Sequence, residues 1–270
     1  LQEPVWNESW GADMGWLMLS GVIGIGIGDV LFFRSLHLLG ASRSAVIETL
    51  TSPSVLHCAF IMLGETLSVF TAFGGALILI GILIVTTARA PNAPEETTEA
   101  LTKAELIDGV LTGVVSVVAM SISIVAVKPI IETHSVLWAT SMRLVGGLAI
   151  MLVALPFVPA FRRETWSALK PTAGWRFALP GAFFGTYIAL FSWIGGYKFT
   201  TATVASLLNQ TSTLFIVAGA TLFLGERLTR RRAGAVALAL AGSLIVLLTS
   251  VDSEAPRSVS EPLAELGAEP

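Results

Sequence analysis

The sequence has few of the residues on which several classes of protein depend. It contains one cysteine, Cys58, so the chain cannot form an intramolecular disulfide. It has three histidines, and no spacing of His, Cys, Asp or Glu matches a metal or nucleophile motif, so we expect no metal, cofactor or catalytic residues. Charged residues are only 13% of the chain and form no basic stripe, which argues against nucleic acid as a partner.

Apolar residues are abundant instead. They make up 54% of the 270 residues, and the mean hydropathy is +0.78. A chain of this composition has more apolar surface than a soluble domain of its length can bury. A membrane-spanning helix needs about 20 such residues. The sequence predicts an integral membrane protein with eight spans, approximately Met14–Leu36, Ser44–Leu63, Val69–Thr87, Leu106–Val127, Val136–Phe157, Phe177–Tyr197, Thr203–Leu224 and Ala233–Val251.

The chain contains an internal repeat. Gly64, Glu65 and Leu67 return as Gly225, Glu226 and Leu228, an offset of 226 − 65 = 161 residues. The same offset relates further pairs: Gly24 and Gly185, Ala41 and Ala202, Glu48 and Asn209, Ser68 and Thr229, and Gly81 and Gly242. A duplication of this length is typical of transporters that carry their site between two repeats.

The helix count predicts that the repeats are inverted. The spans beginning at Met14 and near Phe177 are the first and the sixth, and an odd separation places the two copies upside down relative to each other. The second copy has five spans and the first has three, so we expect two further helices before Leu1. The predicted fold is an all-α membrane protein with eight visible transmembrane helices of a ten-helix, five-plus-five inverted-repeat bundle. Its segments would be the end of the first repeat (1–88), a linker (89–105), the second repeat (106–251) and a disordered acidic tail (252–270).

Several motifs resemble one known family. The motifs are Gly24-x-Gly26-x-Gly28-Asp29, Phe33-Arg34-Ser35-Leu36, Gly40-Ala41-Ser42, Leu63-Gly64-Glu65, Gly195-Gly196-Tyr197, Thr201-Ala202-Thr203 and Leu224-Gly225-Glu226-Arg227-Leu228. From Met14 to Val251 the chain resembles EamA-type members of the drug/metabolite transporter superfamily, and Arg143 resembles an arginine that this family carries in the second helix of each repeat. The resemblance implies transport of small metabolites, amino acids or toxic compounds, often outward.

The repeated Gly-Glu motif is interpreted first as a structural turn. Gly64 lies where a helix is expected to end and a positive φ is favoured, and Ser68 lies where the next helix needs an N-cap. Glu65 and Glu226 are expected mainly to stabilise this turn and the N-terminus of the helix that follows. A contact at a gate is the alternative role.

Polar residues within apolar spans are the candidates for a substrate path, because such groups are costly unless they face a cavity or a partner. Glu48 and its repeat counterpart Asn209, followed by Gln210, are predicted to face each other across the two-fold axis. Glu48 could instead lie in the headgroup zone near the N-terminus of its helix. Asp29 could line the cavity or make a hydrogen bond to a neighbouring helix.

Three larger side chains and one proline complete the candidates. Arg143 could bind an anionic group or, as the preferred interpretation, pair with a carboxylate such as Glu132. Tyr187 and Trp193 could form an aromatic wall, with a role as interfacial anchor as the alternative for Trp193. Pro53 predicts a kink or local unwinding, a hinge candidate. Its counterpart Leu214 is not a proline, so this feature is expected in one repeat only.

The function predicted from these observations is secondary-active transport, directed outward, by alternating access. Its partners would be a small-molecule substrate, protons carried by Glu48 or Asp29, and the lipid bilayer, with the protein a monomer or homodimer in the plasma or inner membrane. The excess of Lys and Arg on the side of Arg43, Arg176 and Arg230 predicts that this side is cytoplasmic. A non-transporting membrane sensor or scaffold, or less favourably an intramembrane enzyme, is the alternative.

Overall fold

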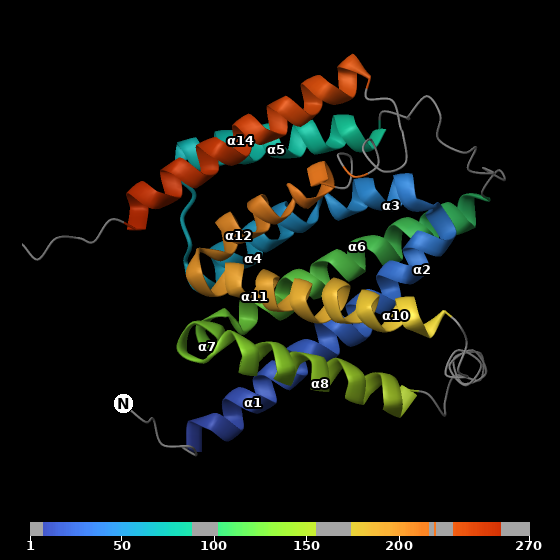
Figure 1. The fold of residues 1–270 in the computed structure, drawn as a ribbon, viewed down its shortest axis with the longest axis vertical. Coiled ribbons are helices and arrows are strands. Elements are labelled where there is room, and N and C mark those ends of the chain that lie inside the picture. Colours follow the sequence, from blue (N-terminus) through green and yellow to red (C-terminus); the bar gives the residue numbers. More distant parts are fainter. Residues whose placement is uncertain (1–7, 88–101, 155–173, 216–218, 220–228, 255–270) are drawn as a thin grey trace, which may run out of the picture.

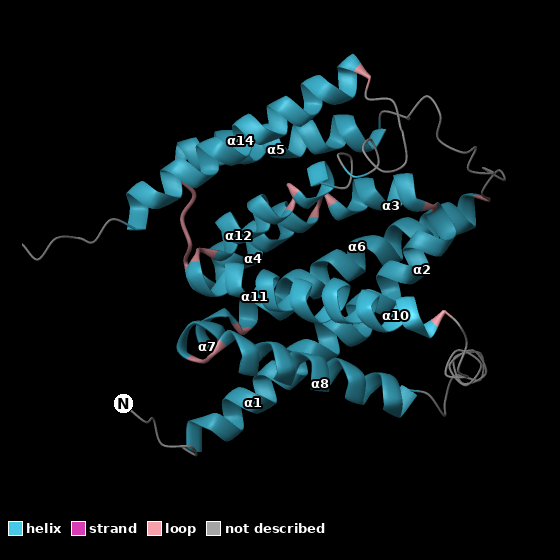
Figure 2. Cartoon of the chain, in the orientation of Figure 1, coloured by secondary structure: helices cyan, strands magenta, loops and turns pink. Residues whose placement is uncertain are grey.

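The computed structural model describes residues 8–87, 102–154, 174–215, 219 and 229–254, and all regular elements among them are helices (Figure 2). Two of the elements, labelled η, are π-helical. In chain order the elements are α1 (Glu8–Gly21), η1 (Val22–Gly28), α2 (Asp29–Leu39), α3 (Ala41–Glu48), α4 (Thr51–Leu63), α5 (Val69–Thr87), α6 (Lys103–Ala126), α7 (Lys128–Thr133), α8 (Val136–Ala154), α10 (Trp175–Ala182), η2 (Phe183–Ile188), α11 (Ala189–Phe199), α12 (Ala202–Asn209) and α14 (Arg230–Glu254).

The apolar helices confirm a membrane protein of the all-α class. Among the residues that the structure describes, five helical stretches are long and apolar enough to cross a bilayer: Gly11–Leu39, Arg43–Leu63, Lys103–Ala126, Val136–Ala154 and Trp175–Phe199. Two shorter apolar helices, Val69–Val85 and Ala233–Thr249, occupy the positions of two further expected spans. The remaining expected span, Thr203–Leu224, lies partly outside the described residues.

The structure moves one expected boundary and extends another. Helix α6 begins at Lys103 rather than near Leu106, because Thr102 and Glu105 form a capping box in which each side chain accepts the other residue's amide hydrogen. Helix α14 continues to Glu254 and so includes the first three residues of the acidic segment expected as a tail from Asp252. The rest of the predicted linker and tail lies outside the described residues.

Helices α5 and α14, whose first residues are 161 positions apart, lie side by side (Figure 1). Glycines allow the close approach: a Cβ atom on Gly74 would lie 2.8 Å from the carbonyl oxygen of Gly242, and one on Gly81 would lie 2.7 Å from that of Ala235. The offset of 161 relates Gly74 to Ala235 and Gly81 to Gly242. The repeat therefore exchanges the two contacts, as expected for a two-fold packing of equivalent helices.

The turn between α4 and α5 confirms the interpretation of Gly64 and Ser68. Gly64 caps α4 in the left-handed conformation, with φ of 67°. The hydroxyl of Ser68 accepts the amide hydrogen of Thr71 over 3.0 Å, as an N-cap does. Glu65, between them, points elsewhere, as described below.

Two clusters of buried apolar side chains fix the position of α12. The first cluster joins α1, α4, α6 and α11 through residues such as Leu17 and Ile194, and it includes Ala202 and Ala205 of α12. The second joins α5 and α14 through Ile78 and Val246, and it includes Val204 and Leu207 of α12. Helix α12 therefore packs between the α5/α14 pair and the other helices.

Candidate functional site

A cavity of about 400 Å³ lies between elements of the two repeats. It combines one carboxylate, one amide, one hydroxyl and one indole with aliphatic side chains. The described residues that line it are Ile25, Asp29, Leu144, Gly185, Thr186, Ala189, Leu190, Trp193 and Asn209. Three of the residues selected from the sequence, Asp29, Trp193 and Asn209, meet in this cavity, whereas Thr186 carries no sequence signal that distinguishes it.

The cavity is bordered by both π-helical segments. Segment η1 starts at Val22 and η2 at Phe183, so the two are related by the repeat offset of 161 residues. Ile25 of η1 and both Gly185 and Thr186 of η2 line the cavity. Segments of π-helix are uncommon in proteins, and those that occur are often found at functional sites. Their equivalent placement in both repeats marks this region as the candidate site.

Asp29 is the ionisable group that the described lining contributes. It is half-buried and is the first residue of α2, directly after η1. Its charge is attracted by the guanidinium of Arg143 and repelled by the carboxylate of Glu48, and Arg143 forms no direct ion pair with it in the described part of the chain. Asp29 is thus the centre of a short series of interacting charges.

Arg143 is buried behind the cavity wall, beside the lining residue Leu144. It is 2% exposed, and its Nη1 donates to Ser20 Oγ over 2.6 Å and to the carbonyl oxygen of Ser123 over 3.2 Å. Its Nε is a buried donor without a partner among the described residues. Arg143 joins α1, α6 and α8 and is not exposed to a ligand.

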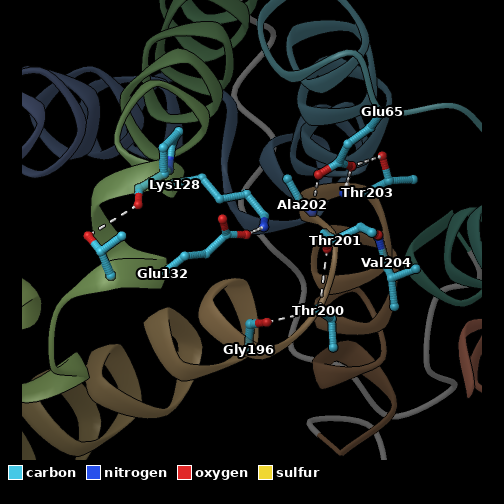
Figure 3. Close-up of polar contacts among 11 residues, drawn as sticks. Glu65, Lys128, Glu132, Gly196, Thr200, Thr201, Ala202, Thr203 and Val204 are labelled. Atoms are coloured by element: carbon cyan, nitrogen blue, oxygen red, sulfur yellow. Dashed lines mark hydrogen bonds and ion pairs between the residues drawn. The ribbon is translucent and has the colours of Figure 1, made fainter. Parts of the chain in front are cut away.

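The expected pairing of Arg143 with Glu132 is wrong. Glu132 forms an ion pair with Lys128, one turn earlier in the short helix α7, as Figure 3 shows. A lysine and a glutamate four residues apart in one helix are neighbours on its surface, so the Lys128–Glu132 pair could have been expected from their spacing.

Glu48 and Gln210 meet where two helices are interrupted. Helix α3 ends at Glu48 and α4 begins at Thr51, and Gln210 Nε2 donates to the carbonyl oxygen of Glu48 over 3.3 Å. The Glu48 carboxylate accepts a long, 3.4 Å hydrogen bond from Thr51 Oγ1. Asn209 lines the cavity, whereas Glu48 and Gln210 are not among the described residues of its lining.

The interruption occurs in both repeats. Thr49 and Leu50 form a turn in the first repeat, and Gln210 and Thr211, which are 161 residues later, form one in the second. The expectation of a break in one repeat only is therefore wrong. Pro53 lies in the first turn of α4, after the break, and the second break occurs without a proline. Side-chain contacts between the repeats, rather than the proline ring, accompany both breaks.

The two aromatic candidates differ in position. Trp193 lines the cavity and packs edge-on against the buried Tyr197, with ring centroids 4.8 Å apart. Tyr187 stacks on Phe183 within η2 at 5.9 Å and is not among the described lining residues. Trp193 therefore provides an aromatic surface within the cavity.

Glu65 contacts a different helix from the one expected. Its carboxylate does not stabilise the N-terminus of α5, which follows it, but accepts hydrogen bonds from the amides of Ala202 and Thr203 at the start of α12. Its counterpart Glu226 lies outside the described residues. No group of three or more His, Cys, Asp or Glu that could hold a metal occurs in the described ranges.

Comparisons with known proteins agree with this architecture. The model of the EamA-like transporter family matches residues 2–87 and 107–248. No curated protein matches the chain. A solved structure titled "Crystal structure of protein" is similar over 94% of this chain and 79% of its own, with a TM-score of 0.68 and 19% identity, a likeness of fold.

Proposed function

The chain belongs to the EamA-like transporter family of the drug/metabolite transporter superfamily, and we propose that it exports a small organic solute by alternating access through the cavity at Asp29. The family is one of transporters, and the apolar helices make the chain a multi-pass membrane protein. The observation that carries the proposal is the cavity itself, which residues of both repeats line together.

Equivalent features in the two repeats support a ten-helix, five-plus-five inverted bundle. The π-helical segments, the helix breaks and the α5/α14 pair each recur at the offset of 161 residues. The counterparts α5 and α14 run in opposite directions along the molecule (Figure 1). In transporters of this architecture, interrupted helices near the repeat interface surround the substrate, and the repeats move against each other to expose it on alternate sides.

The lining indicates the substrate class. Asp29 is an acidic group, and no lysine or arginine is among the described residues that face the cavity. A cationic amine could bind Asp29 and lie over the indole of Trp193, while Asn209 and Thr186 offer hydrogen bonds to polar groups. We therefore propose that the substrates are small amphipathic compounds that carry an amino group, including amino acids. We also propose that the protein lies in the cell membrane.

Proton coupling is proposed for the same carboxylate. Asp29 both lines the cavity and interacts with the charges of Arg143 and Glu48. A proton and a substrate amine that compete for one carboxylate would be exchanged across the membrane in opposite directions. Glu48, outside the described lining, would adjust this exchange rather than carry it.

Flux into proteoliposomes tests the proposal. The panel should contain amines, amino acids and neutral analogues, with the unaltered chain compared with Asp29→Asn. Asp108→Asn is the matched control, because Asp108 pairs with Arg34 at an exposed site away from the cavity. We expect saturable flux of amine-bearing compounds that is lost in Asp29→Asn and kept in Asp108→Asn. Equal flux in all three, or no flux of any compound by correctly inserted protein, would contradict it.

A further inference from the structure

We propose that Glu65 is a positioning residue for transport: it holds α12 so that Asn209, at the opposite end of this helix, remains in the cavity. The inference rests on the proposed function, because the cavity is taken as the substrate site. The position of α12 can nevertheless be measured without transport. It assigns to Glu65 a role at the site although Glu65 is not among the described residues that line the cavity.

The Glu65 carboxylate makes three hydrogen bonds to the first two residues of α12 (Figure 3). Its Oε1 accepts the amide hydrogen of Ala202 over 2.8 Å. Its Oε2 accepts the amide hydrogen of Thr203 over 3.0 Å and the hydroxyl hydrogen of Thr203 over 2.8 Å. Both oxygens of one carboxylate are therefore used on one helix end, which fixes direction as well as distance.

The contact completes the capping of α12. The hydroxyl of Thr201 accepts the amide hydrogen of Val204 over 3.2 Å, so the amides of residues 202, 203 and 204 all have acceptors. Helix N-termini carry unpaired amide donors and a partial positive charge, which a carboxylate stabilises. In α3, the equivalent helix of the first repeat, the N-cap residue is Gly40, which makes no side-chain capping bond.

The other end of α12 is held by the same part of the first repeat. Ser52 Oγ donates to the carbonyl oxygen of Ser206 over 2.9 Å, and Gln210 Nε2 donates to that of Glu48. All these partners lie between residues 48 and 65. Helix α12 has eight residues, about 12 Å at 1.5 Å per residue, and is therefore short enough to move as one rigid rod.

The position of Asn209 depends on how α12 is held. Residues 202–207 of α12 are buried, whereas Asn209 is exposed to the cavity. Release of the N-terminus from Glu65 would let α12 tilt or turn about its remaining contacts near Ser52. Such a displacement would withdraw Asn209 from the cavity and uncover buried neighbours such as Leu207. Glu65 thus acts on the substrate through α12 and not by contact.

Thiol labelling in the full chain measures this displacement. In a Cys58→Ser background, Asn209→Cys and Leu207→Cys each provide one thiol, one facing the cavity and one 6% exposed. With Glu65 present, a small hydrophilic maleimide should label position 209 much faster than position 207. With Glu65→Ala, we expect the ratio of the two rates to fall by about tenfold or more, because hydrogen bonds to a charged group are lost.

Two further variants separate positioning from general stability. Glu65→Gln keeps one carbonyl acceptor and should restore most of the ratio. Glu105→Ala removes a capping carboxylate from the exposed start of α6, where the described hydrogen bonds of Glu105 are to Thr102, and should leave the ratio unchanged. An unchanged ratio in Glu65→Ala, or an equal fall in Glu105→Ala, would overturn the proposal.

If Glu65→Ala does not fold, Thr203→Val replaces it. This variant removes only the hydroxyl bond to Glu65, so the ratio should fall in the same direction by a smaller factor, and no fall would overturn the proposal. In flux measurements we expect Glu65→Ala to raise KM for the substrate more than it lowers the maximal rate. Absence of flux in the unaltered chain would contradict the proposed function alone, because labelling does not depend on transport.

Discussion

Gln210 donates a hydrogen bond to the carbonyl oxygen of Glu48, 162 positions earlier in the chain, and so joins the breaks of the two interrupted helices. The offset of 161 makes Glu48 the counterpart of Asn209, the residue beside Gln210. One break therefore supplies a donor to the carbonyl that the other break exposes. A carbonyl without this donor would be costly at a depth where water is excluded.

The first prediction concerns this bond. Gln210→Ala should lower the free energy of unfolding by about 1–2 kcal/mol, because it leaves the Glu48 carbonyl without its donor. Thermal unfolding in detergent measures the effect. Ser243→Ala is the control, since Ser243 donates within its own helix, to Ala239, and its loss should change the free energy by less than about 0.5 kcal/mol. Equal changes in the free energy of unfolding for the two variants would show that the bond between the breaks stabilises the protein no more than a bond within one helix.

The second prediction tests whether Pro53 causes the helix break that precedes it. Because the break at Gln210 and Thr211 has no proline, Pro53→Ala should leave the turn at Thr49 and Leu50 intact, with amide exchange at these residues unchanged. Ser52→Ala, in contrast, should destabilise the protein by about 1 kcal/mol, because the carbonyl oxygen of Ser206 loses its hydrogen bond. Slower exchange of the Thr49 and Leu50 amides in Pro53→Ala than in the unaltered chain would indicate that the proline causes the break.

The third prediction tests Arg143 as a structural residue. Arg143→Ala should lower the free energy of unfolding by about 2–4 kcal/mol, because it empties a buried volume and removes the bonds to Ser20 and Ser123. Arg143→Met fills the volume without the charge and should recover part of this loss. A flux measurement on Arg143→Met then shows whether the charge also acts on Asp29. Full stability of Arg143→Ala would refute the structural assignment.

The fourth prediction concerns the close contact of α5 and α14. Gly81→Ala places a Cβ atom 2.7 Å from the carbonyl oxygen of Ala235, so the helices must separate, at a cost of about 1–3 kcal/mol. Gly181→Ala adds the same group where no described atom outside its own stretch of helix lies within 4 Å, and should be neutral or stabilising by up to about 1 kcal/mol. Melting temperatures of the two variants in one detergent provide the comparison; equal values would contradict the packing.

The fifth prediction distinguishes the two carboxylates. Asp29→Asn should abolish transport driven by a pH gradient, because Asp29 lines the cavity. Glu48→Gln should keep gradient-driven transport with a shifted pH dependence, because its charge acts on Asp29 from outside the described lining. Flux with and without an imposed gradient separates the cases. Loss of the gradient response in Glu48→Gln alone would reverse the assignment.

The sequence by itself determined the membrane class, the approximate positions of most described helices and the recurrence of motifs at an offset of 161 residues. Apolar runs decide which segments leave water, and Gly64 and Ser68 act through local backbone geometry, so neither depends on distant contacts. The selection of Asp29, Trp193 and Asn209 as candidates also needed only their polarity or aromatic character within apolar spans.

The tertiary structure alone decided which of these residues meet. Glu65 caps α12 and not its own helix, Arg143 donates to Ser20 and Ser123 and does not pair with Glu132, and the second break forms without a proline. The contacts of Glu65 and Arg143 join residues that are far apart in sequence, and they form only when the helices pack on one another. Local patterns cannot specify them, because the partner of a buried polar group is whichever group the fold brings within about 3 Å.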